Sequence, residues 1–326
     1  MRRKWLVEVL RDETKSAVIL FSVALVTLIW VFSPFAQILF DFVNTEVSLG
    51  SFQMDIRTIS SEYLLAVFFF IAGIELRQEI SIGSLNSFKA GSVPVLAAIG
   101  GMIFPALIYL YLSPLDAGWG IPMATDLPFA LGVIAIFGKR LSLEVRAFLL
   151  ALAIVDDSLS VLVITFGTGH SSIHPTLIAV ILGLIVPTRN EFSEKLREFI
   201  QPFSSGIVLP LFAITALAVP LNISHLLNDQ TAAISLARLV GKPLGVTIGA
   251  VLAIALLRSR ASISIREIFV VGCVASIGFS VSLLFVNLSG FSPMQVTAAT
   301  GAVIVAIPLS AALGAIASSM TKDPSK

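Results

Sequence analysis

Long apolar runs separated by short polar segments dominate the chain. Most of the runs approach the ~20 residues that a helix needs to cross a bilayer. In lipid only helices and closed barrels satisfy their own backbone groups, and barrel strands would alternate apolar and polar positions, which these runs do not. We therefore predict an all-α integral membrane protein with about ten transmembrane helices, at about 17–40, 61–80, 91–112, 118–138, 147–168, 174–187, 203–221, 231–257, 268–288 and 292–319.

The composition agrees with this class. Of 326 residues, 56% are hydrophobic and 13% are charged, whereas a soluble domain carries about 25% charged residues. The net charge of +1 gives no indication of a nucleic-acid partner. Because no Pro- or Ser-rich linker divides the chain, residues 1–326 are predicted to form a single polytopic membrane domain. We also expect no cofactor.

The basic residues predict an orientation. If the N-terminus is cytoplasmic, the inside segments hold 18 of the 21 Lys and Arg residues, and the outside loops hold only Arg57. Lys and Arg accumulate on the cytoplasmic side of membrane proteins. We therefore expect both termini in the cytoplasm.

The outside loop at 41–60 carries alternating apolar residues around Ser48–Ser51. This pattern is typical of a short β-hairpin, although an irregular loop would also fit it.

Ionisable residues inside the predicted spans are the main functional candidates. Asp126, Asp156, Asp157 and Lys242 each cost roughly 2.5–3.5 kcal/mol at a helix centre. A buried ion pair that only fixes helix packing would explain one Asp with one Lys. Three carboxylates against one lysine do not balance, so the excess negative charge favours a bound cation or protons. Arg238, one turn before Lys242, is expected to snorkel or to pair with an acid.

Two spans are predicted to be broken. Pro122 and Pro128 bracket Asp126, and proline removes a helix hydrogen bond, so this span should unwind near Asp126. The glycine-rich stretch 270–282 predicts a second break. Broken helices expose positive N-terminal and negative C-terminal half-helix ends, which Asp126 and Lys242 respectively could compensate.

Three motifs surround these residues: W-G-I-P-M-A-T-D-L-P-F-A-L-G (119–132), A-L-A-I-V-D-D (151–157) and G-K-P-L-G (241–245). In this order they resemble the NhaA family of sodium/proton antiporters. The resemblance implies inverted repeats with two broken crossing helices, in a secondary active transporter rather than an enzyme. It also implies location in the cell inner membrane, a role in pH homeostasis, and extrusion of Na+ or Li+ by alternating access in exchange for H+.

By this resemblance Asp157 is the principal cation- and proton-binding carboxylate, and Asp156 assists it, so Na+ is expected at Asp156 and Asp157. Thr125 and Asp126 match the family's unwound-helix residues beside the site. Lys242 matches the family lysine that pairs with the residue at Asp156. Protons and sodium would compete for the same carboxylates.

Glu75 and Glu79 match acids near the cytoplasmic mouth that the family links to cation uptake and pH response. A solvated helix end beside Arg77 is the alternative interpretation. The family resemblance also leads us to consider a homodimer formed through the 41–60 loop.

The chain departs from the family pattern in two places that concern function. About two spans are missing after the double-aspartate helix. In addition, E-K-L-R-E-F-I-Q-P-F (194–203) lacks the usual acid and histidine pattern, with Arg197 and Gln201 in its place.

Other functions were weighed against antiport. An intramembrane aspartyl protease needs two carboxylates from facing helices that share a proton, whereas Asp156 and Asp157 are adjacent on one helix. A homologue with impaired transport, or a cation-coupled carrier of an organic solute on the same scaffold, is the main alternative.

Overall fold

The computed structural model describes residues 13–49, 52–83, 85–113, 116–127, 129–130, 133–134, 142–167, 175–188, 192–221, 226, 228–258 and 263–319. Helices account for most of these residues, and each of the ten predicted spans contains helix. Six helices are long and apolar enough to cross a membrane, and two bent helix pairs raise this number to eight. The remaining predicted spans are the short helix α9 and the segment around Asp126, which is helical only in part. The prediction of an all-α membrane protein is confirmed.

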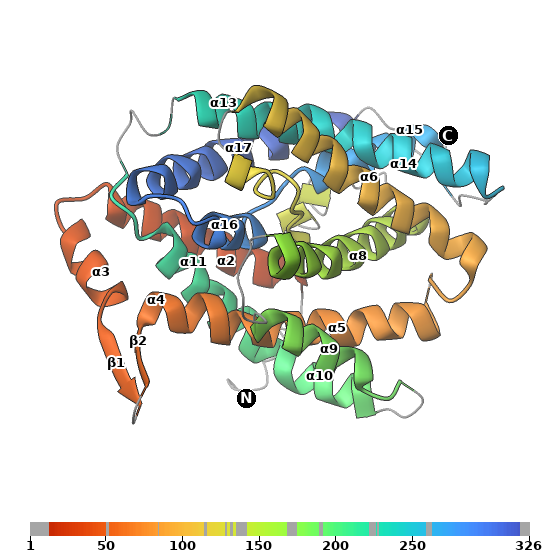
Figure 1. Ribbon diagram of the computed structural model, residues 1–326. Helices are drawn as coiled ribbons and strands as arrows, with labels where there is room; N and C mark the ends of the chain where they lie inside the picture. The colour runs from red at the N-terminus through yellow and green to blue at the C-terminus, as the bar shows by residue number, and fades with distance from the viewer. Residues whose placement is uncertain are drawn as a thin grey trace.

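Most helices lie side by side, roughly parallel or antiparallel to one another, in a single bundle (Figure 1). The α-helices are α2 (Glu13–Val31), α3 (Ala36–Val43), α4 (Ile56–Thr58), α5 (Leu65–Ser81), α6 (Phe88–Leu112), α8 (Leu143–Gly167), α9 (Pro175–Ile185), α10 (Phe192–Phe203), α11 (Leu209–Leu217), α13 (Asp229–Leu236), α14 (Lys242–Leu256), α15 (Ile265–Ala275), α16 (Ser280–Leu288) and α17 (Pro293–Ser319). The other helical units are the 3-10 turn η2 (Asp116–Gly118) and the π-helical turns η1 (Ile59–Leu64), η3 (Ser204–Val208) and η4 (Ala237–Gly241).

The first predicted span differs from the structure. Instead of one helix over 17–40, α2 ends at Val31 and the chain turns by 116° into α3. Pro34 lies in the turn, and proline cannot continue a helix ladder. The apolar run is therefore divided between two helices, which together are long and apolar enough for one span.

The predicted hairpin is confirmed. Strand β1 (Glu46–Leu49) pairs antiparallel with β2 (Phe52–Asp55), with Glu46 opposite Asp55. The hairpin projects from one corner of the bundle next to α3 and α4 (Figure 1). Its position leaves it free of the helix packing that builds the core.

The π-helical turns η3 and η4 come immediately before α11 and α14, each of which carries a proline in its first two residues, Pro210 and Pro243. Because proline has no N–H to donate, the preceding turn widens. π-helical turns are often found at functional sites. In this chain η3 and η4 carry residues of the two polar regions described below.

Glycines bring several helices into backbone contact. Gly100 of α6 faces Gly245 of α14, and Gly249 faces the carbonyl of Leu96. Gly73 of α5 and Gly183 of α9 meet in the same way. Small residues allow such close packing between membrane helices, where van der Waals contact replaces the hydrophobic effect.

Adding a methyl group at Gly100 should lower the stability of the bundle. A Cβ there would overlap the carbonyl oxygen of Gly245, and overpacking typically costs about 1–3 kcal/mol. We expect Gly100→Ala to lower the unfolding temperature of the detergent-solubilised protein. Ile103→Ala on the same helix, where the side chain is 48% exposed, is the control and should change it little. Equal unfolding temperatures for wild type and Gly100→Ala would contradict the close contact.

Candidate functional site

Two interrupted helices cross in the interior of the protein. The first is unwound at residues 124–126. The second is broken between α15 and α16, and the chain bends by 55° at this break. The Asp126 N–H donates to the Ile277 carbonyl at 2.7 Å, and the Thr125 hydroxyl donates to the Ala275 carbonyl at 2.9 Å. Both predicted breaks are confirmed, and they lie directly against each other.

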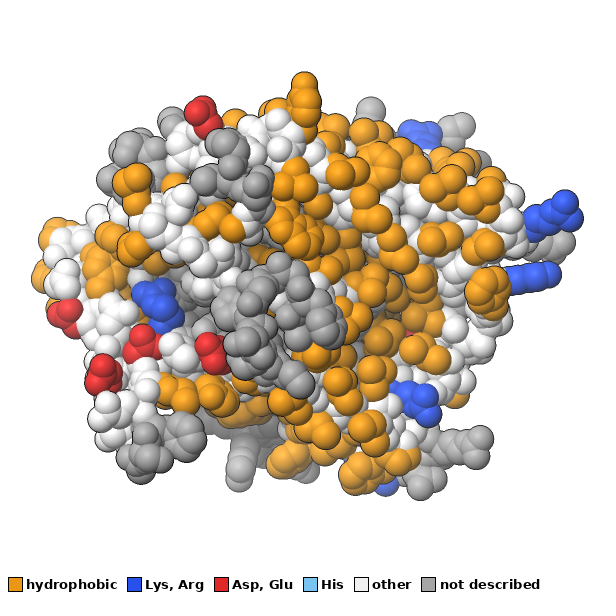
Figure 2. All heavy atoms as spheres, in the orientation of Figure 1, with side chains coloured by type: hydrophobic (Ala, Val, Ile, Leu, Met, Phe, Trp, Pro, Cys, Tyr) orange, Lys and Arg blue, Asp and Glu red, His pale blue; other side chains and the backbone are white. Residues whose placement is uncertain are grey.

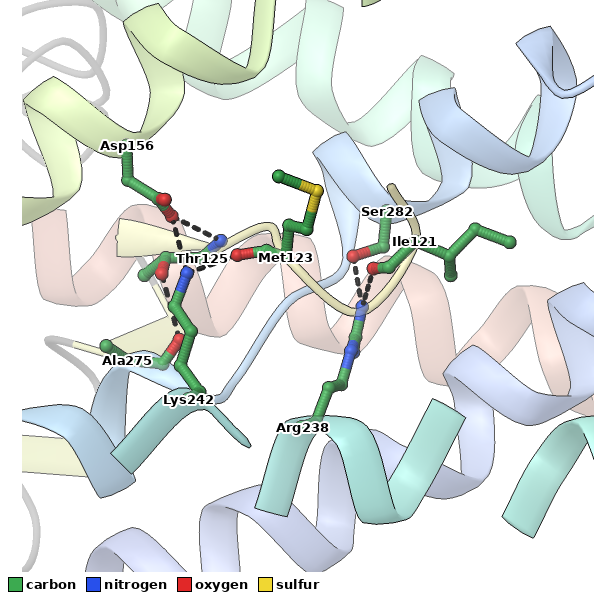
Figure 3. Close-up of polar contacts among 8 residues, drawn as sticks. All are labelled: Ile121, Met123, Thr125, Asp156, Arg238, Lys242, Ala275 and Ser282. Atoms are coloured by element: carbon green, nitrogen blue, oxygen red, sulfur yellow. Dashed lines mark hydrogen bonds and ion pairs between the residues drawn. The ribbon is translucent and has the colours of Figure 1, made fainter. Parts of the chain in front are cut away.

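Asp156 forms an ion pair at this crossing. Its Oδ2 accepts hydrogen bonds from Lys242 Nζ at 2.8 Å and from the Thr125 N–H at 3.0 Å. Lys242 also donates to the Met123 carbonyl. The side chains of Asp156 and Lys242 are fully buried. Figure 3 shows Lys242 extending from α14 toward Asp156 and the non-helical segment that contains Met123 and Thr125.

Asp157 has a different environment from its neighbour. Consecutive helical residues point about 100° apart, and Asp157 lines a pocket together with Glu75, Ile154 and Leu127. The other polar lining residues are Ser16, Gln201, Ser204 and Ser205. Asp157 Oδ1 is buried and has no hydrogen-bond partner among the described residues. The pocket therefore offers a carboxylate oxygen and several hydroxyl groups, which are hard ligands suited to a small cation.

The two predicted glutamates, Glu75 and Glu79, lie in different surroundings. Glu75 lines the pocket that contains Asp157, and Arg197 Nη1 of α10 lies 3.5 Å from its Oε1. Glu79, one turn further along α5, is not among the described residues that line this pocket. Arg197, noted as a departure from the family pattern, is thus the partner of Glu75.

Asp126, a residue of the first break, binds the second break through its carboxylate. Its Oδ2 accepts hydrogen bonds from the Ser280 N–H at 2.9 Å and from the Ser280 hydroxyl at 2.7 Å. Ser280 is the first residue of α16, so the carboxylate is placed at the positive end of that half-helix. Asp126 is not among the described residues that line the Asp157 pocket. This geometry fits the charge-compensating role better than direct contact with a cation in that pocket.

Arg238 makes contacts at the crossing that were not predicted from the sequence. It is fully buried, and it neither snorkels nor pairs with an acid within hydrogen-bond distance among the described residues. Nη1 donates to the Gly278 carbonyl at 2.7 Å, while Nη2 donates to the Ile121 carbonyl at 2.9 Å and to the Ser282 hydroxyl. The available signal was an arginine in an apolar span, one turn before Lys242.

Arg238 corrects the charge balance expected from sequence. The three buried carboxylates, Asp126, Asp156 and Asp157, are opposed by two buried cations, Lys242 and Arg238. The excess among these residues is therefore one negative charge rather than two.

Comparison with known proteins identifies the scaffold. The model of the family described as Na+/H+ antiporter 1 matches residues 7–169 and 166–317, which is most of the chain. The chain belongs to the NhaA family of Na+/H+ antiporters.

Members of the NhaA family from several bacteria are similar to the chain over most of its length. The antiporter NhaA of Nocardia farcinica is 32% identical over 88% of this chain and 84% of its own length. NhaA of Pasteurella multocida is also 32% identical, over 86% of this chain and 90% of its own length. NhaA 1 of Clostridium beijerinckii is 29% identical over 94% of this chain.

The comparisons also bear on the length of this chain relative to other NhaA proteins. The alignment with the Nocardia farcinica protein runs over 349 positions, more than the 326 residues of this chain, so that protein has residues without a counterpart here. The family model matches in two pieces that meet at 166–169, where α8 ends. This is the place at which the sequence indicates the shortening.

Removing the Thr125 hydroxyl should weaken the crossing. Thr125→Val keeps the shape of the side chain but loses the bond to the Ala275 carbonyl, and a buried carbonyl left without its partner costs about 1–3 kcal/mol. We expect a lower unfolding temperature in detergent.

Thr247→Val is a matched control for this change. The Thr247 hydroxyl donates at 2.7 Å to the Pro243 carbonyl of its own helix, so its loss does not separate two elements. If Thr247→Val lowers the unfolding temperature as much as Thr125→Val does, the hydroxyl at the crossing has no special contribution.

Proposed function

We propose that this chain exchanges Na+ for protons at Asp157, with Asp156 as the second carboxylate and with alternating access to the two sides of the membrane. The protein is a sodium/proton antiporter and thus a transporter rather than an enzyme. Membership of the NhaA family does not favour a transport-impaired homologue or a carrier of organic solutes. The observation that supports Asp157 most directly is its buried Oδ1, which has no hydrogen-bond partner among the described residues, in a pocket lined by both polar and apolar side chains.

Competition for one carboxylate explains the coupling of the two ions. A buried Asp157 needs either a proton or a cation to neutralise it, because an unpaired charge in a dry interior is costly. Na+ therefore displaces the proton on one side, and the proton displaces Na+ on the other. No bound cofactor is needed for this exchange.

Asp156 can assist without leaving Lys242. Its Oδ2 holds Lys242 and the Thr125 N–H, while its Oδ1 is buried without a partner among the described residues. One oxygen thus remains available to a cation beside Asp157. In this proposal Thr125 contributes mainly by holding Asp156 and the crossing in place.

We assign Glu75 to the path by which the cation reaches Asp157 and Glu79 to the rim outside it. Glu75 shares the pocket with Asp157, and its side chain is 19% exposed. Arg197 departs from the acid and histidine pattern that the family resemblance leads us to expect on this helix, so the response of this protein to pH should depend on the Glu75–Arg197 pair.

The surface supports an orientation in the membrane. Hydrophobic side chains cover the face over α6, α8 and α14, while Lys and Arg gather mostly at the end opposite the hairpin and Asp and Glu at the hairpin end (Figure 2). The protein is a multi-pass membrane protein. We place the basic end and both termini in the cytoplasm, with the inner membrane as the location.

Asp157→Asn should abolish exchange while the protein still inserts, because an amide cannot bind a proton or carry the charge that Na+ neutralises. The measurement is dequenching of a pH-sensitive dye in everted vesicles given pulses of Na+, Li+ and K+. Wild-type protein should respond to Na+ and Li+ and not to K+.

Glu144→Gln is the control for this substitution. Glu144 lies at the exposed beginning of the same helix, and its variant should keep the response. Sodium-dependent proton movement in Asp157→Asn vesicles would rule out the proposed site.

We also propose that the hairpin at 41–60 joins two copies into a homodimer. It projects from the bundle with edges that can pair with another strand. Replacing 46–55 by a Gly-Ser linker should convert the detergent-solubilised protein from dimer to monomer by mass photometry, with exchange retained. A dimer that persists without the hairpin would contradict this interface.

A further inference from the structure

The two broken helices are held by two sets of opposite charges in equivalent positions, one cation and one aspartate at each break. At the first break the Met123 carbonyl binds Lys242, and two residues later the Thr125 N–H binds Asp156. At the second break the Gly278 carbonyl binds Arg238, and two residues later the Ser280 N–H binds Asp126. In each case a cation holds a carbonyl and an aspartate holds the N–H two residues further on.

Both cations come from one helical unit. Arg238 lies in η4 and Lys242 is the first residue of α14. Figure 3 shows the two side chains rising side by side from this unit toward the crossing. The two aspartates come from different elements: Asp156 lies in α8, and Asp126 lies in the unwound segment 124–126.

The pairs differ in their chemistry. Lysine carries a compact charge on a flexible stem and can change its protonation state, whereas arginine stays charged and presents a planar fork of donors. Lys242 binds the carboxylate next to Asp157, the proposed ion ligand. Arg238 has only carbonyl and hydroxyl partners among the described residues, and Asp126 is held twice by Ser280.

Arg238 also connects the two breaks. One of its nitrogens donates to the Gly278 carbonyl of the second break, and the other donates to the Ile121 carbonyl of the first. The non-helical segment 121–126 is therefore attached to η4 and α14 through two carbonyls, those of Ile121 and Met123. If Lys242 releases the Met123 carbonyl, the hydrogen bond from Arg238 to the Ile121 carbonyl still holds this segment.

We propose that Arg238 is a positioning residue which, with Asp126, forms a permanent counterpart of the Lys242–Asp156 pair. It ties the second broken helix to the first while the Lys242 pair changes partners as ions bind and leave. This inference rests on the proposed exchange at Asp157. It assigns Arg238 to the movement of the crossing and not to the binding of the ion.

The test separates the rate of exchange from ion affinity. The full chain is reconstituted in liposomes, and initial rates are measured against Na+ concentration for wild type and Arg238→Met. Arg238→Met loses the hydrogen bonds from the charged guanidinium to both broken helices. The maximal rate of exchange should therefore fall by about tenfold or more. The Na+ concentration at half-maximal rate should stay within about twofold, because Arg238 does not touch Asp157 or its pocket.

Two further variants complete the series. Arg146→Met removes an exposed arginine from α8 and should leave the rate and the half-saturating concentration unchanged. Ser282→Ala removes one partner of Arg238 while keeping the guanidinium, and should lower the maximal rate by a smaller factor. If Arg238→Met does not fold, Ser282→Ala decides the question by the same two readouts.

An unchanged maximal rate in folded Arg238→Met would overturn the inference, and so would a tenfold rise in the half-saturating Na+ concentration at an unchanged rate. These outcomes are distinct from failure of the proposed function. If Asp157→Asn retains exchange, the ion site is wrong. If Asp157→Asn loses exchange and Arg238→Met behaves like wild type, only the role of Arg238 is wrong.

Discussion

The structure depends on partners for the backbone N–H and carbonyl groups that two broken helices leave unpaired in the buried interior. Each break leaves N–H and carbonyl groups without intrahelical partners, and in a membrane protein such groups must be satisfied internally. Here aspartates take the N–H groups of Thr125 and Ser280, and Lys242 and Arg238 take the opposing carbonyls. The buried charges are therefore required by the crossing itself, before any ion is bound.

Asp157 stands apart from this arrangement. With Lys242 opposite Asp156, and with Arg238 and Asp126 at the second break, the charges that hold the backbone balance one another. Asp157 is the carboxylate left over, and it faces a pocket with Glu75 and not the crossing. The charges at the crossing thus offset one another and leave Asp157 as a buried carboxylate that a proton or a sodium ion can neutralise. This separation lets the ion change without dismantling the fold.

The sequence predicted what depends on local pattern. Apolar run lengths predicted the spans, and the prolines around Asp126 predicted where the first break occurs. The turn from α2 into α3 was missed because the apolar run continues through Pro34. The partners of Arg238 could not be predicted, because they are mainly backbone carbonyls, which carry no signature in sequence. The contact between Lys242 and Asp156 was expected only through resemblance to the family.

The shortening of the chain does not touch the crossing. The two matches to the family model meet at 166–169, at the end of α8. The described side-chain partners of Asp156, Asp126, Lys242 and Arg238 lie in the unwound segment around Asp126, in α8, in α14 and in the region from α15 to α16. Beyond the shortened region, α9 packs directly on α5 through Gly73 and Gly183. The buried charges at the crossing and the Asp157 pocket are therefore built from described residues that lie on either side of this junction.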